Sequence, residues 1–236
     1  MTTKTIVYID GYNLYYGRLR NPNNPVTYKW LDLVKLFEAL LKAQDPNSEI
    51  VKINYFTAPA LGKFASHGNQ SSDAQDAYHR ALKHLYPDLL EIIMGKHVAA
   101  AKPLPAYFPD NPKAFDKNQR NWVWVLEEKM TDVQIALAMY KDVMQEKCEQ
   151  IVLCSNDSDM LPSLQAIREE KPTLKIGIVM PVNPPKKGEE SRRISGSLDE
   201  LATWTRHYIL DKELEQALLP EKIPTRKKPI LKPLHW

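Results

Sequence analysis

Four aspartates stand where predicted strands end or a predicted helix begins: Asp10, Asp132, Asp157 and Asp159. The first follows the β-branched run 5–9 directly, and the last two follow the apolar run 151–154. Asp132 opens the helical pattern at 131–146. Parallel strands end at one edge of an α/β sheet, where such folds bind their ligands. If the two runs are neighbours in the sheet, four carboxylates converge on that edge.

Each of these carboxylates also has a purely structural explanation. Asp132 would stabilise the N-terminus of its helix, and Asp10 would form a turn with Gly11. Ser158 or Asp159 would cap the next helix. Four carboxylates at one edge repel one another, however, and that repulsion either raises their pKa values or requires a cation.

The ligand types indicate which cation would fit. Carboxylate oxygens without clustered His or Cys suit Mg²⁺ or Mn²⁺ rather than zinc. The only two cysteines, Cys148 and Cys154, also exclude a four-cysteine zinc site. A divalent ion held by carboxylates activates water, neutralises a phosphodiester and stabilises the leaving oxygen. The aspartates therefore predict metal-dependent phosphate chemistry, in which the protein supplies positioning and electrostatics.

Apolar runs and helical patterns alternate along the chain. Strands are predicted over 5–9, 51–56, 89–94, 122–127, 151–154 and 175–180. Helices are predicted over 30–43, 72–85, 131–146, 159–170 and 198–210. Thr131 and Gln134 fit the capping box of the third helix. This alternation predicts an α/β fold with a central, mostly parallel sheet covered by helices on both faces.

Two proline-containing segments lie outside this pattern. Residues 96–121 hold four prolines interleaved with lysines and aromatic rings, and we expect an irregular loop. Its rings either stack on single-stranded bases or pack on the core. Residues 211–236 are basic and proline-rich, and we expect them to form an extended arm after a domain at 1–210. That arm contacts nucleic acid or a protein partner, or it only improves solubility.

Size and charge narrow the class of protein. A chain of 236 residues with 43% apolar residues suits one domain with a tail. The net charge of +3 belongs to the tail, because residues 220–236 hold five basic residues and one acidic residue. The near-neutral body excludes a basic coat over the whole surface. The apolar runs are shorter than the roughly 18 residues of a membrane span, and no signal-peptide pattern opens the chain. We therefore expect a cytoplasmic protein that binds no membrane.

Five short segments carry a resemblance to a known family: VYIDGYNLY at 7–15, YFTA at 55–58, YHRAL at 78–82, EKMTDV at 128–133 and SNDSD at 155–159. Their order and spacing resemble those of NYN domains, the PIN-like ribonucleases. The second and third segments resemble the LabA-like branch of that family. The likeness extends over residues 4–210.

The resemblance implies a PIN-like three-layer α/β/α fold and a metal-dependent endoribonuclease that hydrolyses RNA with Mg²⁺ or Mn²⁺. Four residues match the acidic, metal-binding positions of the family: Asp10, Asp132, Asp157 and Asp159. Asn13 matches the family's amide, which orients a carboxylate or a water. Two positions depart from the pattern, since Ala138 stands where many relatives carry a further acidic residue and Asn156 stands where the family has Gly.

Cations near these segments are candidates for binding the RNA backbone. Arg80 and Lys83 share one face of the helix at 72–85 and form either a phosphate track or an ordinary solvated face. Lys129 either contacts a substrate phosphate or pairs with a carboxylate, and Ser155 is also assigned to substrate binding. The expected partner is single-stranded or structured RNA. The sequence leaves the oligomeric state open, with a homodimer among the arrangements.

Other phosphate-handling folds fit less well. A haloacid-dehalogenase-type phosphatase needs a second Asp where Tyr12 stands, and a topoisomerase–primase-type domain needs Glu where Asp10 stands. The chain contains neither a P-loop nor the Gly-x-Gly-x-x-Gly fingerprint of dinucleotide binding. The alternative to a nuclease is a non-catalytic RNA- or protein-binding module with a vestigial acidic site.

Overall fold

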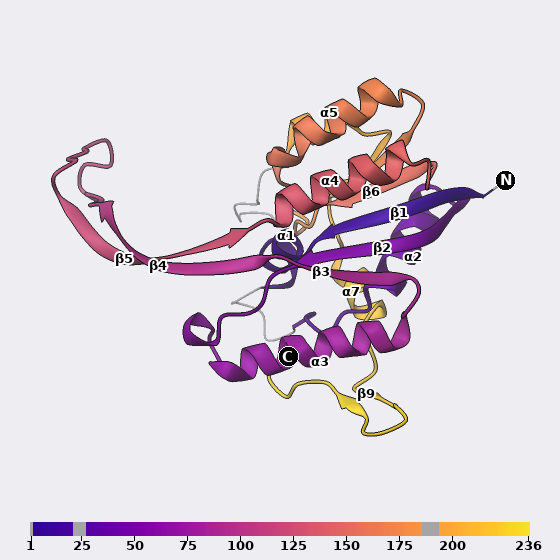
Figure 1. Ribbon diagram of the computed structural model, residues 1–236, viewed down its shortest axis with the longest axis horizontal. Coiled ribbons are helices and arrows are strands. Elements are labelled where there is room, and N and C mark those ends of the chain that lie inside the picture. Colours follow the sequence, from indigo (N-terminus) through magenta and orange to yellow (C-terminus); the bar gives the residue numbers. More distant parts are fainter. Residues whose placement is uncertain (1, 21–26, 186–193) are drawn as a thin grey trace.

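A six-stranded sheet forms the centre of the computed structural model, which describes residues 2–20, 27–185 and 194–236. The strands run in the order β3-β2-β1-β6-β7-β8, and every neighbouring pair is parallel. Their bounds are β1 Thr3–Asp10, β2 Ser48–Thr57, β3 Leu90–Met94, β6 Gln150–Cys154, β7 Lys175–Val179 and β8 Trp204–Arg206. The predicted parallel α/β architecture is confirmed (Figure 1).

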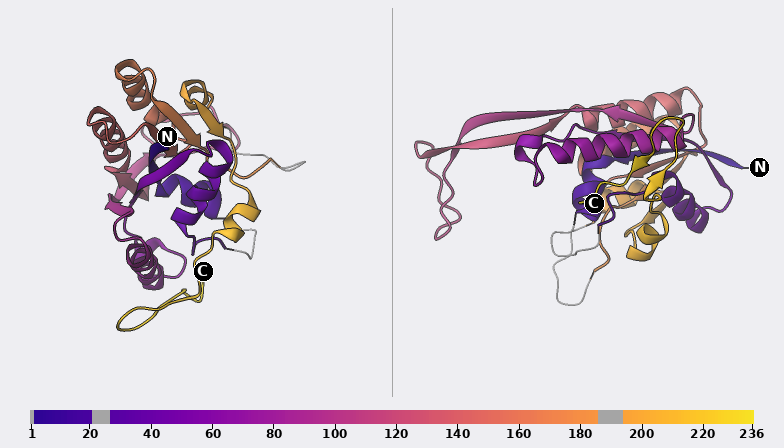
Figure 2. Two further views of the ribbon diagram at one scale, coloured as in Figure 1. Left: turned by 90° about the vertical axis from the view of Figure 1, so that its right-hand side faces the viewer. Right: turned by 90° about the horizontal axis from the view of Figure 1, so that it is seen from below.

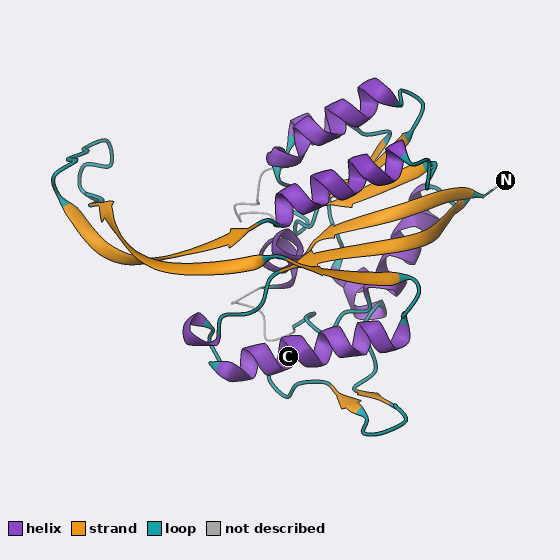
Figure 3. Cartoon of the chain, in the orientation of Figure 1, coloured by secondary structure: helices purple, strands orange, loops and turns teal. Residues whose placement is uncertain are grey.

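Helices cover both faces of this sheet, as Figure 3 shows. One face carries α4 (Thr131–Met144), α5 (Leu161–Glu170) and α6 (Gly196–Leu201). The other carries α2 (Leu33–Gln44), α3 (Asn69–Leu85) and α7 (Asp211–Gln216). Short turns complete the set: α1 (Gly11–Leu14), the π-helical Tyr15–Leu19, and the 3-10 turns Gly62–Phe64 and Ser158–Met160. Within the described residues, no helix combines the length and apolar character needed to cross a membrane.

The alternation of side chains along β1 explains the continuous apolar run at residues 6–9. Ile6 and Tyr8 pack into the core beneath α4 and α5, while Val7 and Ile9 pack into the core beneath α2 and α3. All four side chains are at most 2% exposed. A strand segment buried on both faces needs no polar positions, and this part of β1 is therefore apolar throughout.

The irregular loop predicted at 96–121 is wrong for much of its length. The chain there forms β4 (Lys96–Pro105), which pairs antiparallel with β5 (Arg120–Lys129) in a two-stranded arm that projects from the domain (Figures 1 and 2). The backbone N–H of Ala106 donates to the carbonyl of Gln119 at 2.9 Å. The even-numbered residues of β4 therefore occupy the hydrogen-bonded pairs of the ladder. Pro103 and Pro105 occupy the odd-numbered positions, where a backbone N–H would point away from the partner strand, so the lack of this group in proline costs no hydrogen bond.

Aromatic side chains on this arm are largely exposed. Tyr107 and Phe115 are each 71% exposed. The expectation that these rings pack on the core is therefore wrong. Trp124 is different, because it lies 5.4 Å from the Phe64 ring and 4.1 Å from the ammonium of Lys63. Cation–π and ring contacts therefore fix the base of the arm to the domain.

The C-terminal part of the chain also differs from its prediction. The helix expected at 198–210 is instead the short α6 followed by β8. Residues 211–236 are not an extended arm, because α7 and the hairpin of β9 (Lys222–Ile223) and β10 (Ile230–Leu231) contribute buried side chains to the core beneath α2. Trp236 packs against Tyr78, with ring centroids 5.7 Å apart. Apolar residues between the prolines fold the tail back onto the domain.

Candidate active site at the switch point of the sheet

The direction of the strand order changes between β1 and β6. From β1 the chain adds β2 and β3 on one side, and from β6 it adds β7 and β8 on the other. Ile9 is the register partner of Cys154, so Asp10 and Ser155 leave their strands side by side. In open parallel sheets the ligand crevice lies beyond the carboxyl ends of the strands at such a switch point.

Asp10 is the buried centre of this edge. Its side chain is 2% exposed, yet both carboxylate oxygens accept hydrogen bonds. The backbone N–H of Asn13 donates to Oδ1 at 2.8 Å, and the Ser155 hydroxyl donates to Oδ2 at 2.9 Å. Burial raises the pKa of Asp10 to about 6, against the lowering effect of these two hydrogen bonds. Negative charge on Asp132 and Glu128 raises it further.

The other three predicted aspartates lie within electrostatic reach of one another. Burial raises the pKa of Asp132, and the charges of Asp157, Glu128 and Asp159 add to that rise. Ser155 joins this group to Asp10, because its hydroxyl also accepts the amide N–H of Asp157 at 3.1 Å. The structure thus brings the four aspartates expected from the sequence to one edge of the sheet.

Asn13 and Asn156 form the inner rim of the site. Asn13 is 6% exposed, and its side-chain oxygen accepts the amide N–H of Asn156 at 3.4 Å. The side-chain oxygen of Asn156 in turn accepts the amide N–H of Ser195 at 2.9 Å. Asn156, which replaces the family's Gly, therefore anchors the chain ahead of α6.

Glu128 is the acidic residue that the sequence reasoning did not assign to the site. It lies at the end of β5, where its charge raises the pKa of both Asp10 and Asp132. The hydroxyl of Thr131 donates to its Oε1 at 2.5 Å. The signal was present in the EKMTDV segment, whose first residue is this glutamate.

The same hydrogen bond overturns the predicted capping box. Thr131 is the first residue of α4 rather than its cap, and no side chain caps the helix. The preceding Met130 has a φ of 81°, a left-handed conformation that turns the chain sharply from β5 into the helix. The turn directs Glu128 and Asp132 to the same edge.

The residues expected to bind substrate are less well supported. The ammonium of Lys129 forms an ion pair with the carboxylate of Glu127, with Nζ and Oε2 2.5 Å apart. Pairing with a carboxylate was one of the two roles expected for this lysine. Ser155 is fully buried and engaged with Asp10, which makes it a positioning group rather than a substrate contact. Arg80 and Lys83 are exposed on α3, and within the described residues neither contacts an acidic residue of the site.

The edge offers suitable donors for a divalent cation, although these side chains do not already surround a single point. Across residues 2–20, 27–185 and 194–236, no three His, Cys, Asp or Glu side chains are already gathered around one point. The acidic donors at the edge are carboxylates, and burial together with the neighbouring negative charges raises the pKa of Asp10 and Asp132. Hard oxygen ligands and unrelieved negative charge fit Mg²⁺ or Mn²⁺.

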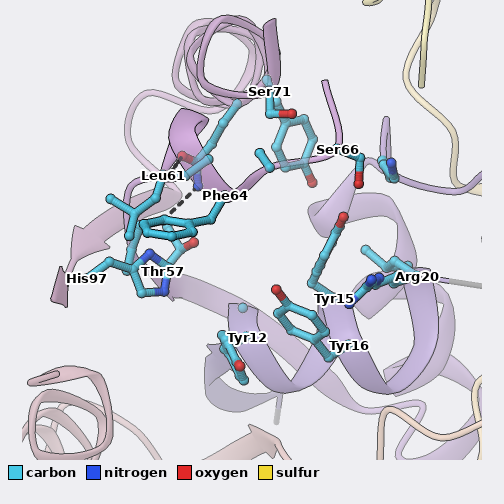
Figure 4. Close-up of a pocket in the computed structure, with 18 of the residues that line it drawn as sticks. Tyr12, Tyr15, Tyr16, Arg20, Thr57, Leu61, Phe64, Ser66, Ser71 and His97 are labelled. Carbon is cyan, nitrogen blue, oxygen red and sulfur yellow. Dashed lines mark hydrogen bonds between the residues drawn. The ribbon is translucent and has the colours of Figure 1, made fainter. Parts of the chain in front are cut away.

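A pocket of about 330 Å³ opens beside the acidic edge. Gly11, Tyr12 and Glu128 line it, so it is continuous with the surroundings of Asp10. Figure 4 shows Tyr12, Tyr15 and Tyr16 on one side of the pocket, with Leu61, Phe64 and His97 on the other. The sequence reasoning did not predict this pocket, because segments far apart along the chain supply its walls.

Comparisons with known proteins agree with this fold. The family model of the NYN domain matches residues 4–195. The chain is 35% identical to 6-hydroxy-3-succinoylpyridine 3-monooxygenase HspA from Pseudomonas putida, over an alignment of 246 residues that covers 99% of this chain and 75% of the relative. Its fold is similar to the crystal structure of a protein of unknown function from Vibrio parahaemolyticus, with a TM-score of 0.50 and 16% identity over 92% of this chain and 97% of that one. Membership of the LabA-like branch stays a prediction. The chain belongs to the NYN domain family, within the PIN-like nuclease superfamily.

Proposed function

We propose that this protein is a metal-dependent endoribonuclease that hydrolyses RNA phosphodiester bonds at the edge around Asp10. The observation that carries the proposal is the buried Asp10 carboxylate, which accepts hydrogen bonds from Ser155 and the backbone of Asn13 and lies within electrostatic reach of Asp132 and Glu128. Charge crowded in this way costs stability unless a cation relieves it. The family assignment supports a nuclease-type hydrolase acting on RNA.

Four residues would hold the cation in this proposal: Asp10, Asp132, Asp157 and Asp159. Mg²⁺ or Mn²⁺ would supply activation of water and stabilisation of the leaving oxygen when bound. Asp10 is held in place by the hydroxyl of Ser155 and the backbone N–H of Asn13, so its orientation does not depend on the ligand. Such preorganised groups at the reacting phosphate need little rearrangement during the reaction.

The test is an RNA cleavage assay with matched variants. Purified protein is incubated with labelled single-stranded and hairpin RNAs in Mg²⁺ or Mn²⁺, and in EDTA. We expect cleavage only with metal, and loss of cleavage in Asp10→Asn and Asp132→Asn. Asp88→Asn, at an exposed carboxylate beyond the end of α3, is the control and keeps activity. Intact RNA in every condition would contradict the proposal. Binding of RNA without metal, unaffected by Asp132→Asn and Asp157→Asn, would instead identify a non-catalytic binding module.

The aromatic lining of the pocket favours a second candidate, the hydroxylation of a heteroaromatic acid. The Pseudomonas putida relative is named as a monooxygenase of 6-hydroxy-3-succinoylpyridine. A monooxygenase acting at ring carbon 3 would place one atom of O₂ on the carbon that carries the succinoyl group and reduce the other atom to water. The acyl group would leave as the aldehyde, and two molecules of NADH would supply the four electrons. Incubating the protein with that compound, O₂ and NADH, and analysing the products by mass spectrometry, tests this candidate. A dihydroxypyridine product that lacks the succinoyl group would support it, and unchanged substrate would remove it.

A further inference from the structure

We propose that the tyrosine-lined pocket beside Asp10 binds one nucleotide unit of single-stranded RNA, with the base among the aromatic rings and a phosphate at Arg20 and Lys29. The choice of RNA as the source of that nucleotide rests on the proposed nuclease function.

The rings at the mouth of the pocket offer faces for stacking. Tyr12 and Tyr16 are 45% and 46% exposed, and their ring centroids lie 4.4 Å apart. His97 lies 6.5 Å from Tyr12, and Phe64 forms part of the opposite wall (Figure 4). Large aromatic side chains seldom stay exposed in such a group without a partner. Nucleobases stack on aromatic rings of this kind, whatever their sequence.

Two cations stand over neighbouring rings of the same wall. The guanidinium of Arg20 lies 5.2 Å from the centroid of Tyr16, and the ammonium of Lys29 lies 6.0 Å from that of Tyr15. Both residues line the pocket, and the positive charge of Arg20 adds to burial in lowering the pKa of Lys29. Within the described part of the chain, neither forms an ion pair, whereas nearby Arg18 pairs with Asp211 at 2.5 Å. Two adjacent unpaired cations indicate a site for an anion.

A buried imidazole supplies an independent sign of a missing ligand. His79 lines the pocket and is only 9% exposed, and its Nε2 has no hydrogen-bond partner among the described residues. Buried polar atoms are nearly always hydrogen-bonded, so an unpartnered one calls for an explanation. Burial lowers the pKa of His79 to about 4, and the ring is therefore neutral at pH 7.

The position of the pocket relates it to the acidic edge. Tyr12 lines the pocket two residues after Asp10, and Glu128 both lines the pocket and raises the pKa of Asp10. A nucleotide held here would bring the adjoining phosphodiester toward the carboxylates. The pocket therefore serves to position the RNA chain, separately from the residues that act on its backbone.

Isothermal titration calorimetry with uridine and adenosine 5′-monophosphates tests the proposal on the full-length protein. We expect both nucleotides to bind, and ribose 5-phosphate, which lacks the base, to bind at least about tenfold more weakly. Tyr16→Ala and Arg20→Ala should each weaken nucleotide binding about tenfold or more. Both side chains are exposed, so these variants should fold. Tyr107→Ala and Lys113→Ala, on the distant arm, are the matched controls and should bind like wild type.

The outcomes separate this inference from the nuclease proposal. Absence of nucleotide binding at millimolar concentrations, or binding unchanged in both pocket variants, would overturn the inference. So would binding of 6-hydroxy-3-succinoylpyridine but not of nucleotides. Hydrolysis of bis(p-nitrophenyl) phosphate by wild type with Mn²⁺ reports on the acidic edge alone. If that hydrolysis occurs without nucleotide binding, this inference fails and the hydrolase stands, whereas nucleotide binding without hydrolysis has the reverse meaning.

Discussion

The hydroxyl of Ser155 donates a hydrogen bond to Oδ2 of Asp10 at 2.9 Å and joins the carboxyl ends of β1 and β6. The contact links residues 145 positions apart, at the point where the strand order changes direction. It favours the charged form of a carboxylate that burial disfavours. This balance gives Asp10 a pKa close to the pH at which a nuclease would use its charge.

Removing that hydroxyl should shift the pH dependence of activity. Ser155→Ala deletes a hydrogen bond to the charged carboxylate, so the pKa of Asp10 should rise above about 6. The acid limb of the pH–rate profile should move upward by about one to two pH units. Ser163→Ala removes a hydroxyl that donates to the Met160 carbonyl away from Asp10, and this control should leave the limb in place. An unchanged limb in Ser155→Ala would contradict the role given to this contact.

Asp10→Asn should alter both stability and metal response. Folding raises the pKa of Asp10, so the folded protein binds a proton more tightly at this carboxyl than the unfolded chain does. The stability that this proton provides is fully present below about pH 4 and is lost as pH rises through about 6. Ionisation in the folded state then costs about 3 kcal/mol. The free energy of unfolding of wild type should therefore fall relative to that of the variant between pH 4 and 7, as urea titrations would measure.

At pH 7.5, Mn²⁺ should raise the melting temperature of wild type more than that of the Asp10→Asn variant. Equal responses would argue against a metal at Asp10.

His79 should act in the opposite direction over the same pH range. Folding lowers its pKa to about 4, so the unfolded chain binds the extra proton and stability falls as pH drops below about 6.5. The full effect is about 3 kcal/mol. The two groups partly cancel in wild type, so each is visible only as a difference between wild type and variant. His79→Gln should be relatively more stable at pH 4.5 than at pH 7.5, and parallel pH dependences would refute a buried neutral histidine.

The packed C-terminus can be tested with two neighbouring residues. Ile230 is 8% exposed and belongs to the core beneath α2, whereas Leu231 is 58% exposed. Ile230→Ala should lower the free energy of unfolding by about 2–4 kcal/mol. Leu231→Ala, the matched control, should change it by less than about 0.5 kcal/mol. Equal effects of the two substitutions on chemical unfolding would indicate that residues 211–236 do not pack as described.

Local sequence predicted the parts of the fold that depend on local patterns. The run at 151–154 predicted a strand buried on both faces, and β6 is such a strand. Asp10 and Asp157 could be placed at one edge because parallel strands must end together. The arm could not be predicted in the same way, because Pro103 and Pro105 disrupt a strand unless their N–H positions face away from the partner.

The parts of the site that were missed depend on tertiary contacts. Glu128 reaches the acidic edge only because Met130 adopts a left-handed turn, a conformation that the sequence did not indicate. The pocket combines α1, the turn at 62–64 and α3, so no single motif contains it. His79, to which the sequence analysis gave no role, is buried because the chain covers that side of α3. Arg80, the next residue of the helix, stays exposed.

The most direct test of the central claim is the single-turnover rate of RNA cleavage with Mn²⁺ for wild type, Asp10→Asn and the control Asp88→Asn. Removing the buried charge should reduce the rate by about 100-fold or more, while the surface substitution should leave it within about twofold of wild type. Cleavage by Asp10→Asn at the wild-type rate, or no metal-dependent cleavage by wild type, would show that the carboxylates at the switch point do not perform this chemistry.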